Sequence, residues 1–272
     1  MNHKILRLEN WVEELQQRGL NAFSLEQARV VFRHISENAL SLSLARYSGK
    51  HKILSILRGY YLIISPKYAS MKVIPPENFI DGLMRSLNRP YYVGLLSAAA
   101  MQGASHQQPQ EFFVFTNLPG MRPIHKNGIK VNFISLVHFP DDTIFDQIKA
   151  EVGYLTISSP AMTALDLVSF ENKIGGLSRA TTVIAELVEN ISPTNFTNKL
   201  LKIAKISTIQ RLGYILEEVL NRRDLSEVLL KYCRKEELNF NKIKLDPTCG
   251  TEGFEVNKKW NLILNTTIES DI

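Results

Sequence analysis

The sequence predicts an α+β protein in which an N-terminal winged helix-turn-helix precedes a mixed α/β domain with a helical C-terminal part. Three observations lead to this prediction. Ser36–Ile64 has the pattern of a helix, a basic turn and a β-ribbon, positive charge gathers around that stretch, and the remainder passes from strands to helices. A chain of 272 residues has room for two domains, which we expect at residues 1–70 and 71–272.

Two short helices are expected before Ser36. Ile5–Arg18 carries apolar residues at helical spacing, and Gly19 is a typical residue to end it. Ser24–Arg33 follows, with Ser24 placed to accept a hydrogen bond from the first helical turn. Gln27 stands three residues later, as a capping box requires. Together with the next helix and the ribbon, these segments form a unit of ordinary domain size.

The third helix is expected to have one apolar and one polar side. Ser36 is its predicted N-cap, because a serine oxygen can accept from the free N–H groups of the first turn. Leu40, Leu44 and Tyr47 fall at helical spacing and share one face. On the other side, asparagine can pair with adenine and arginine with guanine in the major groove of DNA. The residues expected to contact DNA bases are Asn38, Ser41 and Arg46.

A basic turn and a β-ribbon follow this helix. Ser48–Lys52 ends the helix and brings two lysines together. Ile53–Leu57 and Tyr60–Ile64 are rich in β-formers and flank Arg58-Gly59, a short turn signal. Basic residues at such positions contact phosphates, and an arginine at a wing tip can also enter the minor groove. The expected residues of this kind are Lys50, Lys52 and Arg58.

The distribution of charge supports a nucleic-acid partner for the N-terminal region. Residues 1–70 contain ten Lys/Arg and five Asp/Glu, a net charge of +5. The whole chain also has a formal net charge of +5, so residues 71–272 are neutral overall. Clustered basic residues of this kind are the electrostatic signature of phosphate binding. The alternative is a solvated surface that happens to be basic.

The second domain is expected to begin after a linker at Lys72–Pro76, which Pro75-Pro76 stiffens. Its first part is predicted to contain helices at Glu77–Leu87, Val93–Gln102 and Ala161–Phe170, and strands at Glu111–Thr116, Gly128–Val137 and Tyr154–Ile157. Its last part is predicted to contain helices near Leu177–Asn190, Asn195–Ala204, Thr208–Asn221 and Leu225–Cys233, and closing strands at Ile243–Leu245 and Trp260–Leu264.

The composition favours a folded protein of a reducing compartment. Two cysteines, Cys233 and Cys249, are too few for a disulfide framework and lack the paired spacing of a zinc site. The N-terminus lacks the apolar run of a signal peptide. The longest apolar tract, Tyr91–Met101, is too short to span a bilayer. We therefore expect a cytoplasmic protein with no membrane contact, no metal and no cofactor.

Several short motifs occur in one order along most of the chain. They are Arg58-Gly59-Tyr60-Tyr61, Tyr91-Tyr92-Val93-Gly94 with Ser97-Ala98-Ala99 and Gly103, Ser159-Pro160 with Thr163-Ala164-Leu165-Asp166-Leu167, Gly175-Gly176-Leu177, and Arg211-Leu212-Gly213-Tyr214-Ile215-Leu216-Glu217. Each motif is short, but the ordered set is specific. It resembles the AbiEi antitoxins of bacterial type IV toxin–antitoxin systems, which act in abortive infection, a form of phage defence.

The resemblance implies a winged-helix repressor joined to an antitoxin domain. Members of this family bind inverted repeats upstream of their own operon and counter a co-encoded toxin with a nucleotidyltransferase fold. In the type IV arrangement the antitoxin need not form a stable complex with that toxin. The expected partners are thus double-stranded promoter DNA and a functional toxin partner. A homodimer on DNA would supply the two reading heads that two half-sites require.

The sequence shows no recognisable catalytic motif. Its six histidines lack the HExxH spacing of a metalloprotease. Glu255–Lys258 lacks the spacing of a nuclease metal site, Gly175-Gly176 lacks the motif of a nucleotidyltransferase, and Asp166 lies mid-helix. We therefore predict no enzyme activity. Two alternatives stay open: an enzyme acting on nucleic acid, which would depend on Asp166 or Glu255, and a transcription factor with a ligand-sensing domain.

Overall fold

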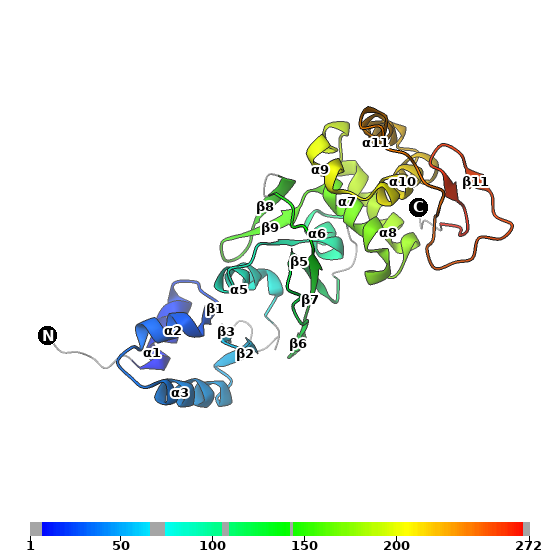
Figure 1. Ribbon diagram of the computed structural model, residues 1–272. Coiled ribbons are helices and arrows are strands. Elements are labelled where there is room, and N and C mark those ends of the chain that lie inside the picture. The colour runs from blue at the N-terminus through cyan, green and yellow to red at the C-terminus, as the bar shows by residue number, and fades with distance from the viewer. Residues whose placement is uncertain (1–6, 66–73, 105–108, 142–143, 269–272) are drawn as a thin grey trace. The chain divides into compact units, whose positions relative to one another are not determined.

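The computed structural model has a mixed α+β fold and describes residues 7–65, 74–104, 109–141 and 144–268 (Figure 1). The chain divides into two compact units. The first comprises Met1–Tyr92, Gln110–Phe139 and Gln147–Thr156, and the second comprises Val93–Pro109, Pro140–Asp146 and Ile157–Ile272. Residues 72 and 73 of the expected linker at Lys72–Pro76, like residue 70, lie outside the described residues.

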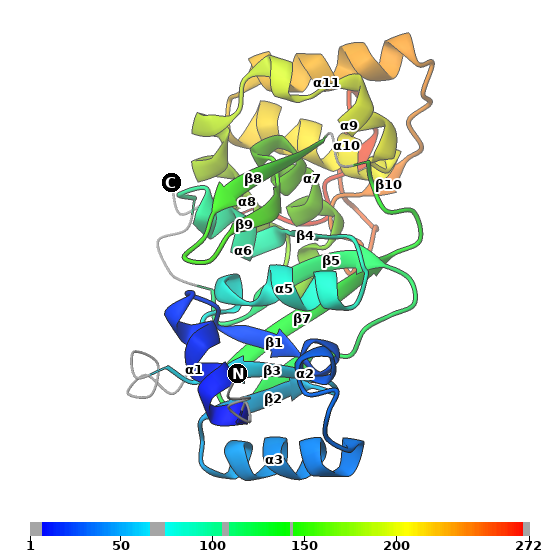
Figure 2. The same ribbon diagram turned by 90° about the vertical axis from the view of Figure 1, so that its left-hand side faces the viewer.

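The N-terminal part of unit 1 contains three helices and three strands among its described residues (Figures 1 and 2). In chain order they are α1 (Leu8–Gln17), β1 (Ala22–Ser24), α2 (Leu25–Val31), α3 (Glu37–Gly49), β2 (Ile53–Leu57) and β3 (Tyr60–Ile63). The strands form an antiparallel sheet in the order β1-β3-β2. The three predicted helices and the predicted ribbon are confirmed; the short strand β1 was not predicted.

Two serines start the second and third helices, as predicted. The Ser24 hydroxyl accepts a hydrogen bond from the Gln27 backbone N–H at 3.1 Å, and the Gln27 side chain accepts one from the Ser24 N–H at 2.8 Å. The Ser36 hydroxyl accepts from the Ala39 N–H at 3.2 Å. Caps of this kind contribute about 1 kcal/mol each. They fix where α2 and α3 begin, and so which side chains face outward.

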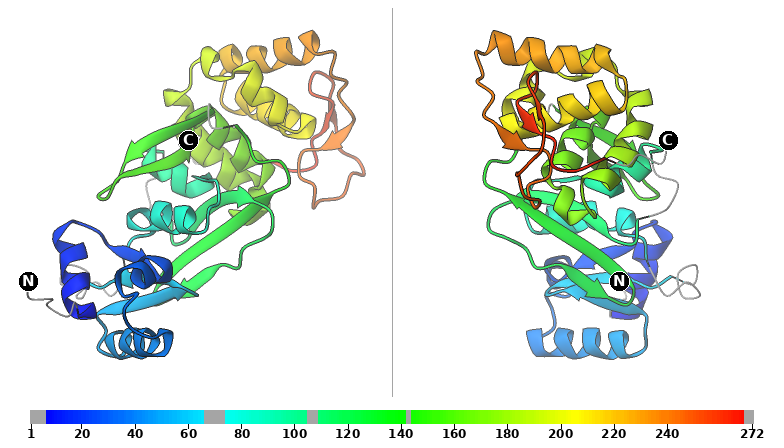
Figure 3. Two further views of the ribbon diagram at one scale, coloured as in Figure 1. Left: turned by 60° about the vertical axis from the view of Figure 1, so that its left-hand side comes forward. Right: turned by 90° about the vertical axis from the view of Figure 1, so that its right-hand side faces the viewer.

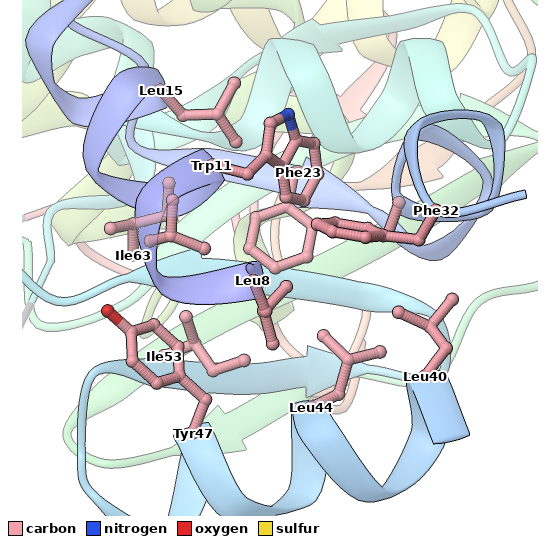
Figure 4. Close-up of a cluster of buried hydrophobic side chains, with 12 residues drawn as sticks. Leu8, Trp11, Leu15, Phe23, Phe32, Leu40, Leu44, Tyr47, Ile53 and Ile63 are labelled. Carbon is pink, nitrogen blue, oxygen red and sulfur yellow. The ribbon is translucent and has the colours of Figure 1, made fainter. Parts of the chain in front are cut away.

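An aromatic core joins the three helices to the sheet (Figure 4). The Trp11 ring meets the Phe23 ring edge-on at 4.9 Å and the Phe32 ring at 5.6 Å. Leu40, Leu44 and Tyr47 bring the apolar face of α3 into the same cluster, as their spacing predicts. Burying a large apolar side chain contributes roughly 1.5–3 kcal/mol. This cluster therefore holds α3 by its apolar face and leaves its polar face outward.

Unit 1 also contains a helical segment and the paired strands of a larger sheet. These elements are η1 (Pro76–Asn78), α5 (Ile80–Ser86), β5 (Phe112–Asn117), β6 (Ile124–Lys126) and β7 (Ile129–Leu136). Strands β5 and β7 are parallel, and β6 and β7 form an antiparallel hairpin. The complete sheet, which also includes β4 (Tyr91–Val93), β8 (Phe145–Lys149) and β9 (Tyr154–Ser158), has the strand order β6-β7-β5-β4-β9-β8.

Unit 2 is mainly helical. Its helices are α6 (Leu95–Met101), α7 (Pro160–Ser169), η3 (Glu171–Lys173), α8 (Leu177–Leu187), η4 (Val188–Asn190), η5 (Pro193–Asn195), α9 (Asn198–Ile203), α10 (Ile206–Tyr214), η6 (Ile215–Val219) and α11 (Arg223–Lys235). Three short strands, β10 (Ile243–Lys244), β11 (Val256–Asn257) and β12 (Leu262–Ile263), form a small sheet in the order β10-β12-β11. Among the described residues, no helix has the length and apolar content to cross a bilayer.

Two helices have different bounds in the structure from those predicted from the sequence. The helix expected over Val93–Gln102 begins later, because Tyr91–Val93 is a strand and the backbone turns at Gly94 before α6. The helix expected over Thr208–Asn221 is α-helical only to Tyr214 and continues as the π-helical turn η6. A buried strand of three residues and a widened helical turn both leave little periodic signal in a sequence.

Candidate nucleic-acid interface

The outer face of α3 carries the three predicted base-contacting residues. Asn38, Ser41 and Arg46 are all exposed, whereas Leu40 and Leu44 are buried on the opposite side. The helix runs for thirteen residues from the Ser36 cap, so the three side chains are spread over more than two turns. A helix with one buried face and one exposed polar face has the shape and the donor groups that fit a DNA major groove.

The predicted phosphate-contacting residues follow α3 directly. Lys50 and Lys52 are exposed in the turn that ends the helix, on either side of His51, which has a left-handed backbone with φ of 53°. The backbone N–H of Lys52 donates to the Tyr47 carbonyl at 3.2 Å. This bond ties the basic turn to the last turn of α3. The two ammonium groups therefore project from an ordered loop rather than from a free tail.

Arg58 is exposed at the tip of the β2–β3 ribbon. Its neighbour Gly59 has a φ of +81°, a conformation that favours glycine. The Gly59 carbonyl accepts a hydrogen bond from the Leu25 N–H at 2.7 Å, which links the ribbon tip to the start of α2. Arg58 thus stands on a fixed turn. The structure gathers all six predicted site residues on α3, the turn after it and the ribbon tip.

The two tyrosines after this turn are not available for stacking on bases. Tyr60 is 4% exposed, and its hydroxyl donates to the Phe79 carbonyl at 3.5 Å. Burial, together with nearby Asp81, raises the pKa of Tyr60 well above its usual value. Tyr61 stacks on Phe23 at 5.3 Å. Both rings support the ribbon, which agrees with leaving them out of the predicted site.

Not every basic residue near α3 is equally free to meet a phosphate. The Arg29 guanidinium lies 3.0 Å from Glu37, in the first turn of α3, and 3.4 Å from Glu26. Hydrogen bonds to Glu37 and then Glu26 raise the pKa of Arg29. Exposed pairs of this kind contribute little to stability. They do neutralise one cation of α2, so the positive charge of the predicted site comes from Arg46 and the basic residues after it.

Leu42 is a surface residue of α3 that the predicted site did not include. Its side chain is 58% exposed and lies between Ser41 and Arg46 on the outer face. A leucine so placed gains nothing from water, but it can contact the methyl group of thymine in a major groove. The sequence signal was present, since Leu42 breaks the apolar spacing of Leu40 and Leu44. The predicted base-contacting residues are all polar, whereas Leu42 would act through an apolar contact.

A second group of polar residues, in unit 2, has a structural role. Gln210 of α10, Gly213 of α10 and Glu217 of η6 form what we call the Trp260 socket. The Gln210 amide donates to the Trp260 carbonyl at 2.7 Å, and the Trp260 indole N–H donates to a Glu217 carboxylate oxygen at 2.8 Å. The indole ring lies so close to Gly213 that a Cβ there would overlap it. The socket therefore holds the C-terminal segment against α10.

Charge inside the socket is balanced by Lys259. Its ammonium contacts the second carboxylate oxygen of Glu217 and lies 3.1 Å from Glu227. Burial by itself would raise the pKa of Glu217, but the hydrogen bonds from Lys259 and Trp260 outweigh it and lower that pKa. A carboxylate with all its partners inside the fold acts as a structural anchor. Glu217 is thus fully engaged in holding Trp260 and Lys259.

The two residues on which an enzymatic alternative would depend do not form a site together with other ligands. Asp166 is 9% exposed within α7, and Glu255 is exposed just before β11. Across the part of the chain that the structure describes, no three His, Cys, Asp or Glu side chains come together as metal ligands.

One family model matches the middle of the chain. Residues 92–218 match the model of the AbiEi antitoxin C-terminal domain. The motifs at Ser159-Pro160 and Arg211–Glu217 lie inside this match, and the motif at Arg58 lies before it. No curated protein matches the sequence.

A solved structure has a similar fold over most of the chain. The crystal structure of the RV2827C protein from Mycobacterium tuberculosis matches with a TM-score of 0.62 and 14% sequence identity. The match covers 94% of this chain and 90% of that one. At this identity the similarity concerns the fold alone. It extends well beyond residues 92–218 and so includes the N-terminal helices and strands.

Proposed function

Because residues 92–218 belong to the AbiEi antitoxin family, we propose that this chain is the antitoxin of a type IV toxin–antitoxin system and also represses its own promoter. In this proposal residues 1–70 are a winged helix-turn-helix that binds DNA, and residues 71–272 counter the toxin. The single observation that carries the DNA-binding half is the outer face of α3, where exposed polar residues continue into an ordered basic turn.

The order and packing of the N-terminal elements support the winged helix. Helices α2 and α3 are joined by a short connection, and α3 is followed by the β2–β3 ribbon, as the wing of this motif requires. Helix α3 uses its apolar face for the core around Trp11 and Phe32. It therefore has only its polar face to offer a ligand, which is how a recognition helix is used.

We assign α3 to the major groove and the ribbon to the adjacent backbone. Asn38 can pair with the N6 and N7 atoms of adenine, and Arg46 with the O6 and N7 atoms of guanine. Ser41 can pair with either base. The residues assigned to phosphates are Lys50, Lys52 and Arg58, with minor-groove insertion open to Arg58 at the ribbon tip.

Repression follows from occupation of the promoter. Inverted repeats offer two half-sites, and one chain carries one α3, so two chains must bind side by side or as a homodimer. A protein so placed blocks the access of RNA polymerase to the same DNA. The proposed protein is cytoplasmic, where this DNA lies, and needs no cofactor for binding.

The antitoxin half acts on a co-encoded toxin of the nucleotidyltransferase type. The family match supports the antitoxin role of residues 92–218. A type IV antitoxin need not form a stable complex with its toxin, so direct contact is not part of the proposal. We propose no enzymatic reaction for this domain.

The DNA-binding half is tested with the operon's upstream DNA in a gel-shift assay. Replacing Arg46 and Arg58 by alanine removes two cations from the proposed contact surface and should weaken binding at low salt. The slope of log affinity against log salt should also fall by about 1 per chain, because Arg58 is the one of the two assigned to a phosphate and each phosphate contact contributes roughly 0.9. Both residues are exposed, so the melting temperature should stay close to that of the wild type.

The matched control removes two exposed lysines from unit 2, Lys173 and Lys258. It changes the net charge by the same amount and should leave affinity and slope nearly unchanged. Equal affinity of the Arg46→Ala/Arg58→Ala variant and the wild type would refute the assignment of this contact face. Failure of the wild type to bind the upstream DNA would refute autorepression itself.

A further inference from the structure

A second basic ribbon lies beside the proposed wing. It is the β6–β7 hairpin, in which β6 (Ile124–Lys126) pairs with the first residues of β7. Residues 121–130 hold Arg122, Lys126 and Lys130 and contain no acidic residue. All three cationic side chains are exposed. None of them was part of the site predicted from the sequence, because they lie more than 60 residues after Arg58.

The hairpin is a rigid element. Its turn consists of Asn127 and Gly128, with φ of 48° and 77°, as in the tight turns that match strand twist. Ile124 and Ile129 are 3% and 2% exposed and anchor the two strands. A ribbon with a tight turn and buried anchors holds its outward side chains in fixed places. It can therefore offer preplaced cations, as the wing does with Arg58.

A hydrogen bond fixes this hairpin to strand β2 of the wing. The Lys126 ammonium donates to the Ser55 carbonyl at 2.6 Å, across 71 residues of sequence. Strand β2 is at the edge of its sheet, and β6 contacts it. Both elements belong to unit 1, and Figure 3 shows the green hairpin next to the light-blue wing strands in both views. The hairpin thus continues the basic surface beyond β2.

The outer side of the hairpin carries the free cations. Successive residues of a strand alternate between its two faces, and directly opposed residues share a face. Lys126 lies on the same face as Ile124 and turns toward β2, while His125 and its partner Lys130 lie on the other face. Glu111 directly precedes the Phe112 that pairs with Val131, so it neighbours Lys130 on this face, and its carboxylate accepts a hydrogen bond from the Asn132 amide at 2.6 Å. Arg122 precedes β6 and adds a second cation at the base of the ribbon.

We propose that the β6–β7 hairpin is a second phosphate-contacting ribbon, which extends the DNA footprint past the wing onto the flank of each half-site. The proposal rests on the DNA-binding function proposed above and adds to it Arg122 and Lys130 as backbone contacts. Lys126 is a positioning residue, because its ammonium is bound to Ser55. Phosphate contacts carry no base preference, so the hairpin adds affinity and orientation rather than sequence specificity.

A purely structural role would account for only one of these cations. A lysine that covers an edge strand protects it from pairing with another chain, and the bond from Lys126 to Ser55 fits that purpose. Arg122 and Lys130 do not contribute to it, because the hydrogen bond to β2 comes from Lys126 alone among the contacts described. An experiment that changes Arg122 and Lys130 and keeps Lys126 therefore tests phosphate contact without altering the protection of the edge strand.

The test uses the full chain and two duplexes from the operon's upstream DNA. The short duplex ends at the outer edges of the inverted repeats, and the long duplex extends about one helical turn further on each side. Wild-type protein should bind the long duplex roughly tenfold more tightly at low salt. The Arg122→Ala/Lys130→Ala variant should lose this preference, and its salt slope on the long duplex should fall by about 2 per chain.

Three controls make the result decisive. The Lys173→Ala/Lys258→Ala variant should keep the preference for the long duplex, since it changes charge in unit 2. An Arg122→Gln/Lys130→Gln variant repeats the test with larger polar side chains, and melting curves check that both variants fold. In hydroxyl-radical footprinting, the Arg122→Ala/Lys130→Ala variant should protect less flanking DNA than the wild type and should still protect the repeats.

The outcomes distinguish the two proposals. If the variant keeps the wild-type preference and footprint, or if the wild type shows no preference for flanking DNA, the hairpin inference is wrong while the function of α3 stands. If the wild type binds neither duplex, both proposals are wrong. If Arg46→Ala/Arg58→Ala weakens binding to the short duplex and the hairpin variant weakens binding only to the long one, both are supported.

Discussion

Helix α3 and the α10–η6 stretch both carry apolar and polar residues. Most polar side chains of α3 are exposed, whereas some of those on α10–η6 are buried. On α3, Asn38 and Arg46 face solvent, and the apolar face alone serves the core. On α10–η6, Gln210 and Glu217 are 1% and 8% exposed, and both bind Trp260. The polar groups of α3 are therefore left at the surface, whereas those of α10–η6 hold the chain to itself.

The glycines of the two helices sharpen this contrast. Gly49, at the end of α3, has nothing within 4 Å of an added Cβ, while Gly213 of α10 lies under the indole of Trp260. A change at Gly49 should therefore have little effect on folding. A change at Gly213 is restricted by the Trp260 ring that packs on it. The following predictions, ordered from the largest effect to the smallest, test this division.

Replacing Gly213 with alanine should give the largest loss of stability. The new methyl group would overlap the Trp260 ring, and overpacking of this kind costs about 3 kcal/mol or more when the neighbour cannot move. Denaturant unfolding measures the loss. The matched control is Gly49→Ala, also helical, which should be neutral or slightly stabilising. If Gly213→Ala and Gly49→Ala changed the free energy of unfolding by similar amounts, close packing of Trp260 on Gly213 would be contradicted.

Replacing Glu217 with glutamine should give an intermediate, pH-dependent loss. Removing the charge that faces Lys259 should cost about 2 kcal/mol at neutral pH. Because the folded state lowers the pKa of Glu217, its ionised form stabilises the fold above the pKa of the unfolded chain. That stabilisation disappears as the pH falls through the carboxylate range below about 4.3.

The measurement for Glu217 is the free energy of unfolding of both proteins between pH 7 and pH 3. The difference between wild type and Glu217→Gln should shrink as the pH falls. Glu218→Gln is the control, since its neighbour Glu218 is exposed; it should change stability by less than about 0.5 kcal/mol. A difference that stays constant with pH would mean that the charge of Glu217 does not anchor the socket.

Replacing Leu42 with alanine should give the smallest effect on stability and a local effect on DNA. Its side chain is 58% exposed, so stability should change by less than about 0.5 kcal/mol. Binding to the operator should weaken by about 1 kcal/mol, and the preference for one base pair should relax. Val30→Ala on α2, 67% exposed, is the control. If Leu42→Ala lost the same affinity as the wild type at every substituted base pair of the operator, Leu42 would not contact a base in the groove.

Local chemistry explains why the N-terminal elements were predictable. Ser24 and Ser36 cap helices through atoms three residues away, and the apolar spacing of α3 fixes its buried side without outside help. Arg58-Gly59 forms its turn within four residues. Interactions between residues so close in sequence produce local patterns that predict the element. The six residues of the candidate interface could be named for the same reason.

Contacts between distant residues explain what could not be predicted. Trp260 meets Glu217 across 43 positions, and Lys126 meets Ser55 across 71. Neither pair leaves a periodic pattern. The motif Arg211–Glu217 suggested a family, but only the structure shows that its Gly213 and Glu217 receive an indole ring. The basic hairpin likewise joins the wing only in the folded chain.

The measurement that tests the account most directly compares repression and antitoxicity in one pair of full-length variants. A reporter fused to the operon's promoter measures repression, and growth with the co-expressed toxin measures antitoxicity. Arg46→Ala/Arg58→Ala should lose repression and still protect against the toxin, while Lys173→Ala/Lys258→Ala should keep both activities. Loss of both activities in a folded Arg46→Ala/Arg58→Ala variant, or retention of full repression, would contradict a division of DNA reading and toxin control between the two regions.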